Sequence, residues 1–203
     1  MLAKIYSAAV YGVDAYEVEV EVNGAGGDPK IFIVGLPDTA VKESRDRVTT
    51  AISNSGYYWP RGRTTINLAP ADIKKEGPSF DLPIALGMLK LETNNRLPDF
   101  DTFCITGELA LSGQLRPVKG VLSIALEAKR RHRQTLIVPA ENVAEAAMVE
   151  GVDVYGANSL SEVVQFLRGE RAMEPVRSAN NWSEAGSVDQ ELDLGKIPSW
   201  RKA

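Results

Sequence analysis

Hydrophobic and polar residues alternate strictly over residues 16–22, where Tyr-Glu-Val-Glu-Val-Glu-Val places a valine at every second position. This alternation predicts a strand with one buried and one solvated face, as in an antiparallel sheet. Residues 2–11 are expected to form another strand of the same sheet. Turn-forming residues fill 23–28, so residues 30–34 are predicted to return as the partner strand of a hairpin.

The turn contains a glycine-rich segment, Gly24-Ala25-Gly26-Gly27. A phosphate-binding loop needs its glycines directly before a helix N-terminus, where backbone N–H groups converge. Here both flanks are predicted strands, which favours a plain hairpin turn. The only Gly-Lys pair in the chain, Gly195-Lys196, lacks the earlier glycine and the following Ser or Thr of a Walker A motif. We therefore expect no nucleotide site in this chain.

Helical periodicity begins after Asp38, which is predicted to cap a helix that runs through Asn54 and stops at Gly56. The pattern then predicts several further elements. Strands are expected at 64–68, 101–111, 115–116, 135–138 and 152–155, and helices at 83–91, 121–131, 142–149 and 160–167. Early strands followed by alternating helices and strands predict an α/β domain in which a mixed sheet is packed with helices.

The composition changes after about residue 169, where aliphatic residues become rare and Ser, Asn, Glu and Asp frequent. Such a segment buries too little apolar surface to offset the entropy lost on ordering. We therefore expect one domain over residues 1–169 and a flexible linker or tail over residues 170–203.

The formal net charge is −4, from 23 basic and 27 acidic residues. This balance gives no general attraction to nucleic acid or to an anionic membrane, so any DNA contact must come from a local patch. The N-terminus lacks a signal-peptide core, and no apolar run approaches the roughly 20 residues that span a bilayer. With a single cysteine, Cys104, in an apolar setting, the sequence predicts a cytoplasmic protein. Cys104 and the single histidine, His132, lack the partners of a metal site.

Basic residues are concentrated in two clusters, the first at residues 129–133 and the second at Arg61 and Arg63. In the first, at the end of a predicted helix, the cations offset the negative helix dipole or, alternatively, contact phosphates. The second lies beside Trp59 and two tyrosines, a composition that suits stacking of single-stranded nucleic acid, although aromatic residues before a strand are more often core or rim. The candidate nucleic-acid-binding residues are Arg61, Arg63, Lys129, Arg130, Arg131 and Arg133.

Ser79 lies between a Gly-Pro turn and a predicted helix start. A serine in this setting can act as a nucleophile beside a helix end that stabilises an oxyanion. The simpler interpretation is that Ser79 caps the helix, and spacing alone favours the cap. Asp81 places a negative charge where an oxyanion would develop, which also favours a structural role.

Three segments, 33–48, 66–86 and 107–120, resemble the signature of ComM/YifB-type, Mg-chelatase-related AAA+ ATPases. With its flanks the resemblance covers about residues 1–168. It implies a Lon-protease-like fold, also described as ribosomal-protein domain 2-like, in an amino-terminal domain that precedes an AAA+ module. The same domain is related to the C-terminal domain of the RadA recombination ATPase.

The resemblance also implies the state of the active site. Lon-type proteolysis pairs a serine with a lysine that takes its proton, because a lone serine is a poor nucleophile at neutral pH. Ser79 matches the Lon serine, but Leu122 stands at the lysine position. Lys119 lies three residues earlier, and the sequence gives no reason for it to replace the missing amine. We therefore expect no catalytic residue, with Ser79 as a relic.

The resemblance implies a non-catalytic assembly or DNA-guiding domain, since ComM proteins are described as hexameric helicases that promote branch migration during natural transformation. The expected partners are the chain's own AAA+ module, ring neighbours and single-stranded or branched DNA, with no membrane. ATP and Mg²⁺ are expected on the AAA+ module, which does not follow residue 203, and no cofactor is expected here. Two alternatives stay open: a residual serine hydrolase of Lon type that uses Ser79, and a magnesium-chelatase-like subunit.

Overall fold

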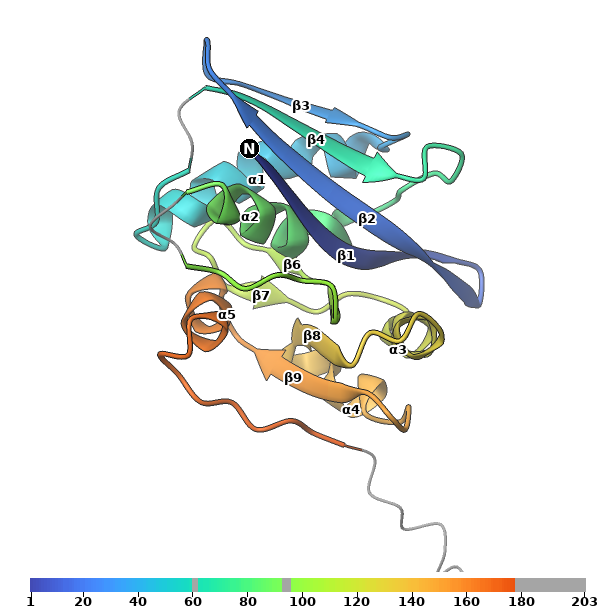
Figure 1. Cartoon of the computed structure of the whole chain (residues 1–203). Coiled ribbons are helices and arrows are strands. Elements are labelled where there is room, and N and C mark those ends of the chain that lie inside the picture. The colour runs from blue at the N-terminus through green and yellow to red at the C-terminus, as the bar shows by residue number, and fades with distance from the viewer. Residues whose placement is uncertain (60–61, 93–95, 178–203) are drawn as a thin grey trace, which may run out of the picture.

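The computed structural model describes residues 1–59, 62–92 and 96–177 and has a mixed α/β fold (Figure 1). In chain order its elements are β1 (Leu2–Tyr11), β2 (Asp14–Ala25), β3 (Lys30–Val34), α1 (Thr39–Asn54), β4 (Arg63–Ala69), the 3₁₀ turn η1 (Pro78–Phe80), α2 (Asp81–Lys90), β5 (Phe103–Ile105), β6 (Glu108–Leu109), β7 (Leu115–Arg116), α3 (Val121–Arg130), β8 (Thr135–Pro139), the 3₁₀ turn η3 (Ala140–Asn142), α4 (Val143–Ala146), β9 (Asp153–Ala157) and α5 (Leu160–Leu167). The predicted fold class is confirmed.

The largest sheet has the strand order β1-β2-β4-β3. The alternating valines of β2 are fully buried, as predicted, and Val20 pairs with Ile5 of β1 and with Leu68 of β4. In Figure 1 this sheet lies at the top, with α1 and α2 packed against one face. Burial of each such valine contributes about 1.5–3 kcal/mol, so the alternation fixes which face of the sheet meets the helices.

The predicted hairpin of β2 and β3 is wrong. β4 lies between these two strands, and β3 pairs with β4 in parallel, with Ile33 opposite Ile66. The helix α1 connects β3 to β4, because parallel strands require a crossover. This arrangement packs Ile31 and Ile33 against the core. Turn residues after β2 show only that the chain reverses there, so they cannot reveal that a later strand inserts into the sheet.

The second sheet is parallel, with the order β5-β8-β9, and β6 and β7 form a separate two-stranded ladder. The predicted strand 101–111 is therefore wrong as a single element. Between β5 and β6, the Thr106 N–H donates to the carbonyl of Ile137 and the Gly107 N–H donates to that of Ser79. The chain thus leaves one sheet and enters the other. The predicted helix 142–149 is also shorter, since α4 covers only Val143–Ala146.

Cys104 is buried in a smaller core beneath α3, and burial raises the pKa of its thiol to about 12. After α5 the chain follows β9, where Val176 forms a bridge with Val154. The rest of the predicted linker, residues 178–203, lies outside the described residues, and the domain boundary at residue 169 stays a prediction. Within the described part of the chain, every helix is too short or too polar to cross a lipid bilayer.

Candidate functional site

The turn that carries Ser79 is held by the cap of α1. As predicted, Asp38 is the N-cap, and its Oδ1 accepts from the Val41 N–H at 2.8 Å. Its Oδ2 accepts from the Gly77 N–H at 3.1 Å. Gly77 has a φ of 78°, a left-handed conformation that a glycine adopts without strain. One carboxylate therefore fixes both the start of α1 and the turn before Ser79.

Ser79 does not cap α2, so the cap interpretation is wrong. Ser79 lies inside η1, and the N-cap of α2 is Phe80, which makes no side-chain capping bond. The carbonyl of Ser79 accepts from the Gly107 N–H at 3.0 Å and from Thr106 Oγ1 at 3.2 Å. Because a 3₁₀ turn precedes the helix, the serine is displaced by one residue from the capping position.

Ser79 lines a cavity of about 540 Å³, which we call the Ser79 cavity. Lys119 lines the same cavity, a proximity to Ser79 that was not predicted. Of the described residues, none forms a hydrogen bond or ion pair with the Ser79 hydroxyl or the Lys119 ammonium. The other lining residues are Val10, Asp38, Glu76, Gly77, Pro78, Glu108, Pro117, Val118 and Ile124.

Leu122, at the position that the resemblance assigns to the Lon lysine, is the second residue of α3. Its side chain is 37% exposed, and its backbone N–H donates to Glu145 Oε1 at 2.9 Å. An aliphatic side chain can neither take nor give a proton. Among the described residues that line the Ser79 cavity, Lys119 is the only lysine.

Asp81 is fully buried at the start of α2 and points to α1. Its Oδ2 accepts from Arg47 Nε at 2.8 Å and from the Leu109 N–H at 3.2 Å, and its Oδ1 accepts from the Ser44 hydroxyl. Burial raises the pKa of Asp81, and the bonds from Arg47 and Ser44 oppose that rise. This carboxylate joins α1, α2 and β6, which gives it the structural role that was predicted.

Three cations of the basic run 129–133 are held by acidic side chains. Glu127 is buried, and it accepts from Arg130 Nε at 2.6 Å and from Arg131 Nε at 3.0 Å. Arg133 donates to Glu17 at 2.8 Å, and its guanidinium lies 3.6 Å from the centre of the Tyr6 ring. Lys129 is exposed on the last turn of α3. These contacts fit a structural role for the run, and its contact with nucleic acid stays a prediction.

The second basic cluster lies elsewhere. Arg63 begins β4, beside the edge strand β3, and its guanidinium lies 4.7 Å from the centre of the Phe32 ring. The run 129–133 instead begins in the last turn of α3 and continues past its end, and α3 packs on β1 and β2 at the other side of the sheet. The structure therefore does not bring the two predicted clusters together. Arg61 lies outside the described residues.

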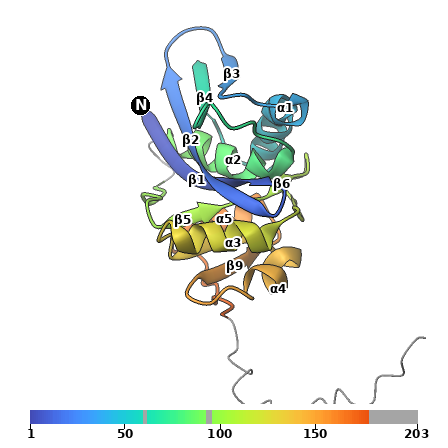
Figure 2. The same ribbon diagram turned by 90° about the vertical axis from the view of Figure 1, so that its right-hand side faces the viewer.

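The β1–β2 turn lies beside α3 (Figure 2). Several large apolar side chains of these two segments are exposed. The Ser123 hydroxyl donates to the Val13 carbonyl at 2.7 Å, and Val13 and Leu126 line one small cavity. Leu122 and Leu126 are four residues apart and so share a helix face. We call this set the α3 apolar surface; its members are between 37 and 87% exposed and are Val10, Tyr11, Val13, Leu122 and Leu126.

This surface was not predicted from the sequence, and neither was a second cavity, which lies between β3 and α1. The apolar surface had a local signal, since Leu122 and Leu126 are spaced by one helical turn on the face opposite to the buried Ile124 and Ala128. The second cavity had a partial signal, because Trp59 was noted beside a basic cluster, but nothing in the sequence connected Trp59 with residues around 30 and 46. Its lining residues come from three separate parts of the chain, around residues 30, 46 and 59.

Comparison with known proteins identifies the family. The family described as subunit ChlI of Mg-chelatase matches residues 18–142, which is more than half of the chain. The chain is 44% identical over 195 residues to YifB of Salmonella typhimurium, covering 96% of this chain and 38% of that protein. It is 43% identical over 200 residues to the competence protein ComM of Haemophilus influenzae, covering 96% and 39%. The chain belongs to the ChlI family of Mg-chelatase-related proteins.

A weaker similarity supports the Lon-like fold. The chain is 26% identical over 177 residues to Lon protease 2 of Bacillus subtilis, covering 78% of this chain and 32% of that protein. The chain thus spans less than two fifths of the length of each of these three relatives. Activities of the whole relatives therefore belong to proteins that contain much more than this domain.

Proposed function

We propose that the chain is a non-catalytic assembly domain of a ComM/YifB-type ATPase, and that it also guides DNA for that enzyme. The observation that carries the proposal is the place of Leu122. Where the Lon resemblance expects an amine, the chain has an aliphatic side chain on an exposed apolar surface. A contiguous apolar surface of this kind is typical of protein–protein contacts. Leu122 therefore provides no proton acceptor, and its exposed side chain provides an apolar contact for a partner.

The Ser79 cavity supports the absence of catalysis. A serine hydroxyl needs a neighbouring base to attack at neutral pH. Within the part of the chain that the structure describes, the Ser79 hydroxyl donates to no side chain. The structure therefore gives the Ser79 hydroxyl no side-chain base that would activate it.

The assembly half is tested by sedimentation velocity over a concentration series up to about 1 mM, which detects weak contacts. We expect the wild-type chain to self-associate and Leu126→Glu to weaken association at least about tenfold, since a tenfold change corresponds to about 1.4 kcal/mol. Leu111→Glu is the matched control, because Leu111 is exposed to the same degree (55% against 53%) but lies on the β6–β7 turn. A wild-type chain that stays monomeric throughout contradicts assembly with ring neighbours.

The proposal extends to the parent protein, and the name of one relative supports this extension. One relative is named a competence protein, and we place the parent protein in DNA branch migration during natural transformation, in the cytoplasm. ATP and Mg²⁺ then bind to the AAA+ module of the parent protein and not to this domain. The domain's partners are that module, neighbouring subunits and DNA. Fluorescence anisotropy with single-stranded and forked DNA tests the guiding half, and it fails if the wild-type chain binds neither.

A residual serine hydrolase is the second candidate, because Ser79 and Lys119 line one cavity. A fluorophosphonate probe separates the two proposals. For a non-catalytic domain, wild type and Ser79→Ala are labelled equally weakly. Labelling that is lost in Ser79→Ala and reduced in Lys119→Met, but kept in Lys74→Met, would establish the hydrolase. Lys74 is the control because it is an exposed lysine that pairs with Glu76 and does not line the cavity.

A further inference from the structure

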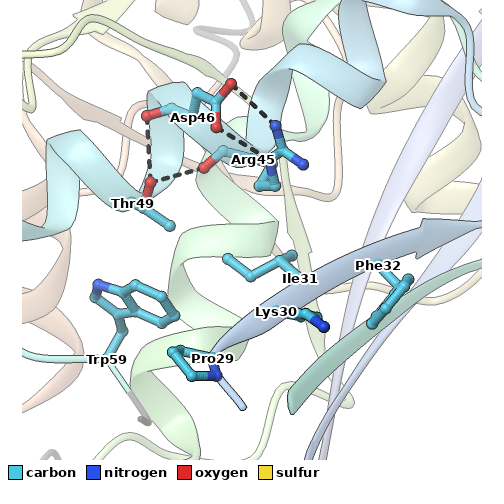
Figure 3. Close-up of a pocket in the computed structure, with 8 residues that line it drawn as sticks. All are labelled: Pro29, Lys30, Ile31, Phe32, Arg45, Asp46, Thr49 and Trp59. Atoms are coloured by element: carbon cyan, nitrogen blue, oxygen red, sulfur yellow. Dashed lines mark hydrogen bonds and ion pairs between the residues drawn. The ribbon is translucent and has the colours of Figure 1, made fainter. Parts of the chain in front are cut away.

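We propose that the cavity between β3 and α1 is a binding site for single-stranded nucleic acid, in which Trp59 stacks on a base and Lys30 and Arg45 meet the phosphates. The cavity measures about 440 Å³ and lies between the edge strand and the middle of the helix (Figure 3). This inference rests on the DNA-guiding half of the proposed function and assigns it to a particular place.

The cavity has apolar walls of the right kind for a base. Figure 3 shows the indole of Trp59 and the side chain of Ile31 directed toward one another from two sides of the opening, with Thr49 on the helix beside them. Trp59 and Ile31 both pack against the core, so their positions are supported from behind. A nucleobase presents a flat π-face that stacks on an aromatic side chain whatever its sequence.

Exposed cations surround these walls. The side chain of Lys30 is 66% exposed and that of Arg45 is 51% exposed. Their carboxylate partners are neighbours in sequence, Asp28 at 3.8 Å and Asp46 at 3.0 Å. Exposed ion pairs of this type contribute little to stability. Either cation can therefore turn from its carboxylate to a phosphate at small cost, provided that the Asp46 side chain, which also lines the cavity, turns toward solvent.

A third cation lies close to the cavity, on the outer face of the sheet edge. The guanidinium of Arg63 lies over the ring of Phe32, which also lines the cavity. Aromatic residues interleaved with cations form the type of surface that follows a single strand, alternating stacked bases with phosphate contacts. The chain as a whole is acidic, with a net charge of −4, so attraction of a polyanion must come from such a local group.

The geometry favours an unpaired strand over a duplex. In a duplex both faces of each base are covered by neighbouring bases, so an indole in a cavity has no free face to meet. In a single strand the bases can be splayed apart and accommodated one at a time. We therefore expect a labelled oligothymidine of about 12 nucleotides, within the site sizes usual for such surfaces, to bind more tightly than a duplex of equal length.

The test is fluorescence anisotropy of that oligothymidine with the 203-residue chain at low salt. We expect Trp59→Ala to raise Kd at least about tenfold, the size that loss of one base–aromatic stack produces. Trp59→Phe keeps an aromatic face and should stay within about threefold. Arg45→Gln should weaken binding and lower the salt slope by about 0.7, one phosphate contact to a single strand. Lys42→Gln, an exposed α1 cation that does not line the cavity, should bind as wild type.

Thermal denaturation of each variant verifies folding, and Trp59→Phe keeps the test valid if the alanine variant is unstable. Wild-type binding that survives Trp59→Ala and Arg45→Gln unchanged overturns this site but leaves DNA guiding in place. Absence of wild-type binding to any single-stranded or forked DNA overturns both. Equal affinity for duplex and single strand overturns the stacking role of Trp59.

Discussion

The buried pair of Arg47 and Asp81 gives the sharpest prediction about stability. We expect Arg47→Met to lower the free energy of unfolding by about 3 kcal/mol, the lower end of the range for removing one partner of a buried ion pair. The lower end applies because the Arg47 side chain is 22% exposed, so water can reach the vacated position. Methionine keeps most of the arginine stem and removes the guanidinium, so the change isolates the charge rather than the packing.

A double variant separates the pair from its surroundings. Arg47→Met with Asp81→Asn should cost less than Arg47→Met alone, because no carboxylate then stays buried without its cation. The asparagine side-chain carbonyl can still accept the bond from the Leu109 N–H that Asp81 accepts at 3.2 Å. Urea denaturation followed by circular dichroism, applied to wild type, Arg47→Met, Asp81→Asn and the double variant, gives the coupling energy of the pair.

The stability that Asp81 contributes depends on pH, and its direction follows from the pKa shift. Burial raises the pKa of Asp81 above its ordinary 3.8, so the folded state takes up this proton more readily than the unfolded state. Stability contributed by this group is then present at low pH and is lost as the pH rises through the folded-state pKa. Arg47→Met removes the main group that opposes the rise, so its deficit against wild type should shrink between pH 7 and pH 5. A loss below about 1 kcal/mol, or a deficit equal at both pH values, refutes this reasoning.

Two further predictions concern the core. Gly87→Ala should lower Tm and cost about 1–3 kcal/mol by overpacking, because an added Cβ would lie 2.5 Å from Val22 Cγ2 and 2.9 Å from Ile5 Cδ1; a Tm equal to that of wild type in thermal denaturation contradicts this. Cys104 should not react with Ellman's reagent at pH 8 until the protein unfolds in urea, because it is buried and its thiol pKa is about 12; rapid reaction of the folded chain contradicts this.

Much of the fold was predictable because its signals are local. The valines of β2 and the cap of α1 at Asp38 each depend on residues within one turn or one strand, and both predictions are confirmed. The position of β3 was not predictable in the same way. It depends on β4, which follows 29 residues after the end of β3 and after a whole helix. Strand order is a property of the sheet and not of any strand.

The contacts of the candidate site residues were likewise predictable only where both partners are close in sequence. The spacing of Glu127 to Arg130 and Arg131 is that of neighbours on one helix face, so the sequence did contain the signal that these arginines have an acidic partner. Arg133 carried no such signal, because its partner Glu17 is 116 residues away. The sequence could likewise not show that Lys119 shares a cavity with Ser79, since that depends on how α2 and α3 pack around the first sheet.

The helix α1 and its cap contribute side chains to two cavities. Its cap residue, Asp38, lines the Ser79 cavity, while Arg45 and Thr49, two and three turns later, line the cavity beside β3. A substitution that shifts α1 as a whole is therefore expected to change the lining of both cavities, because each contains side chains from this helix or its cap.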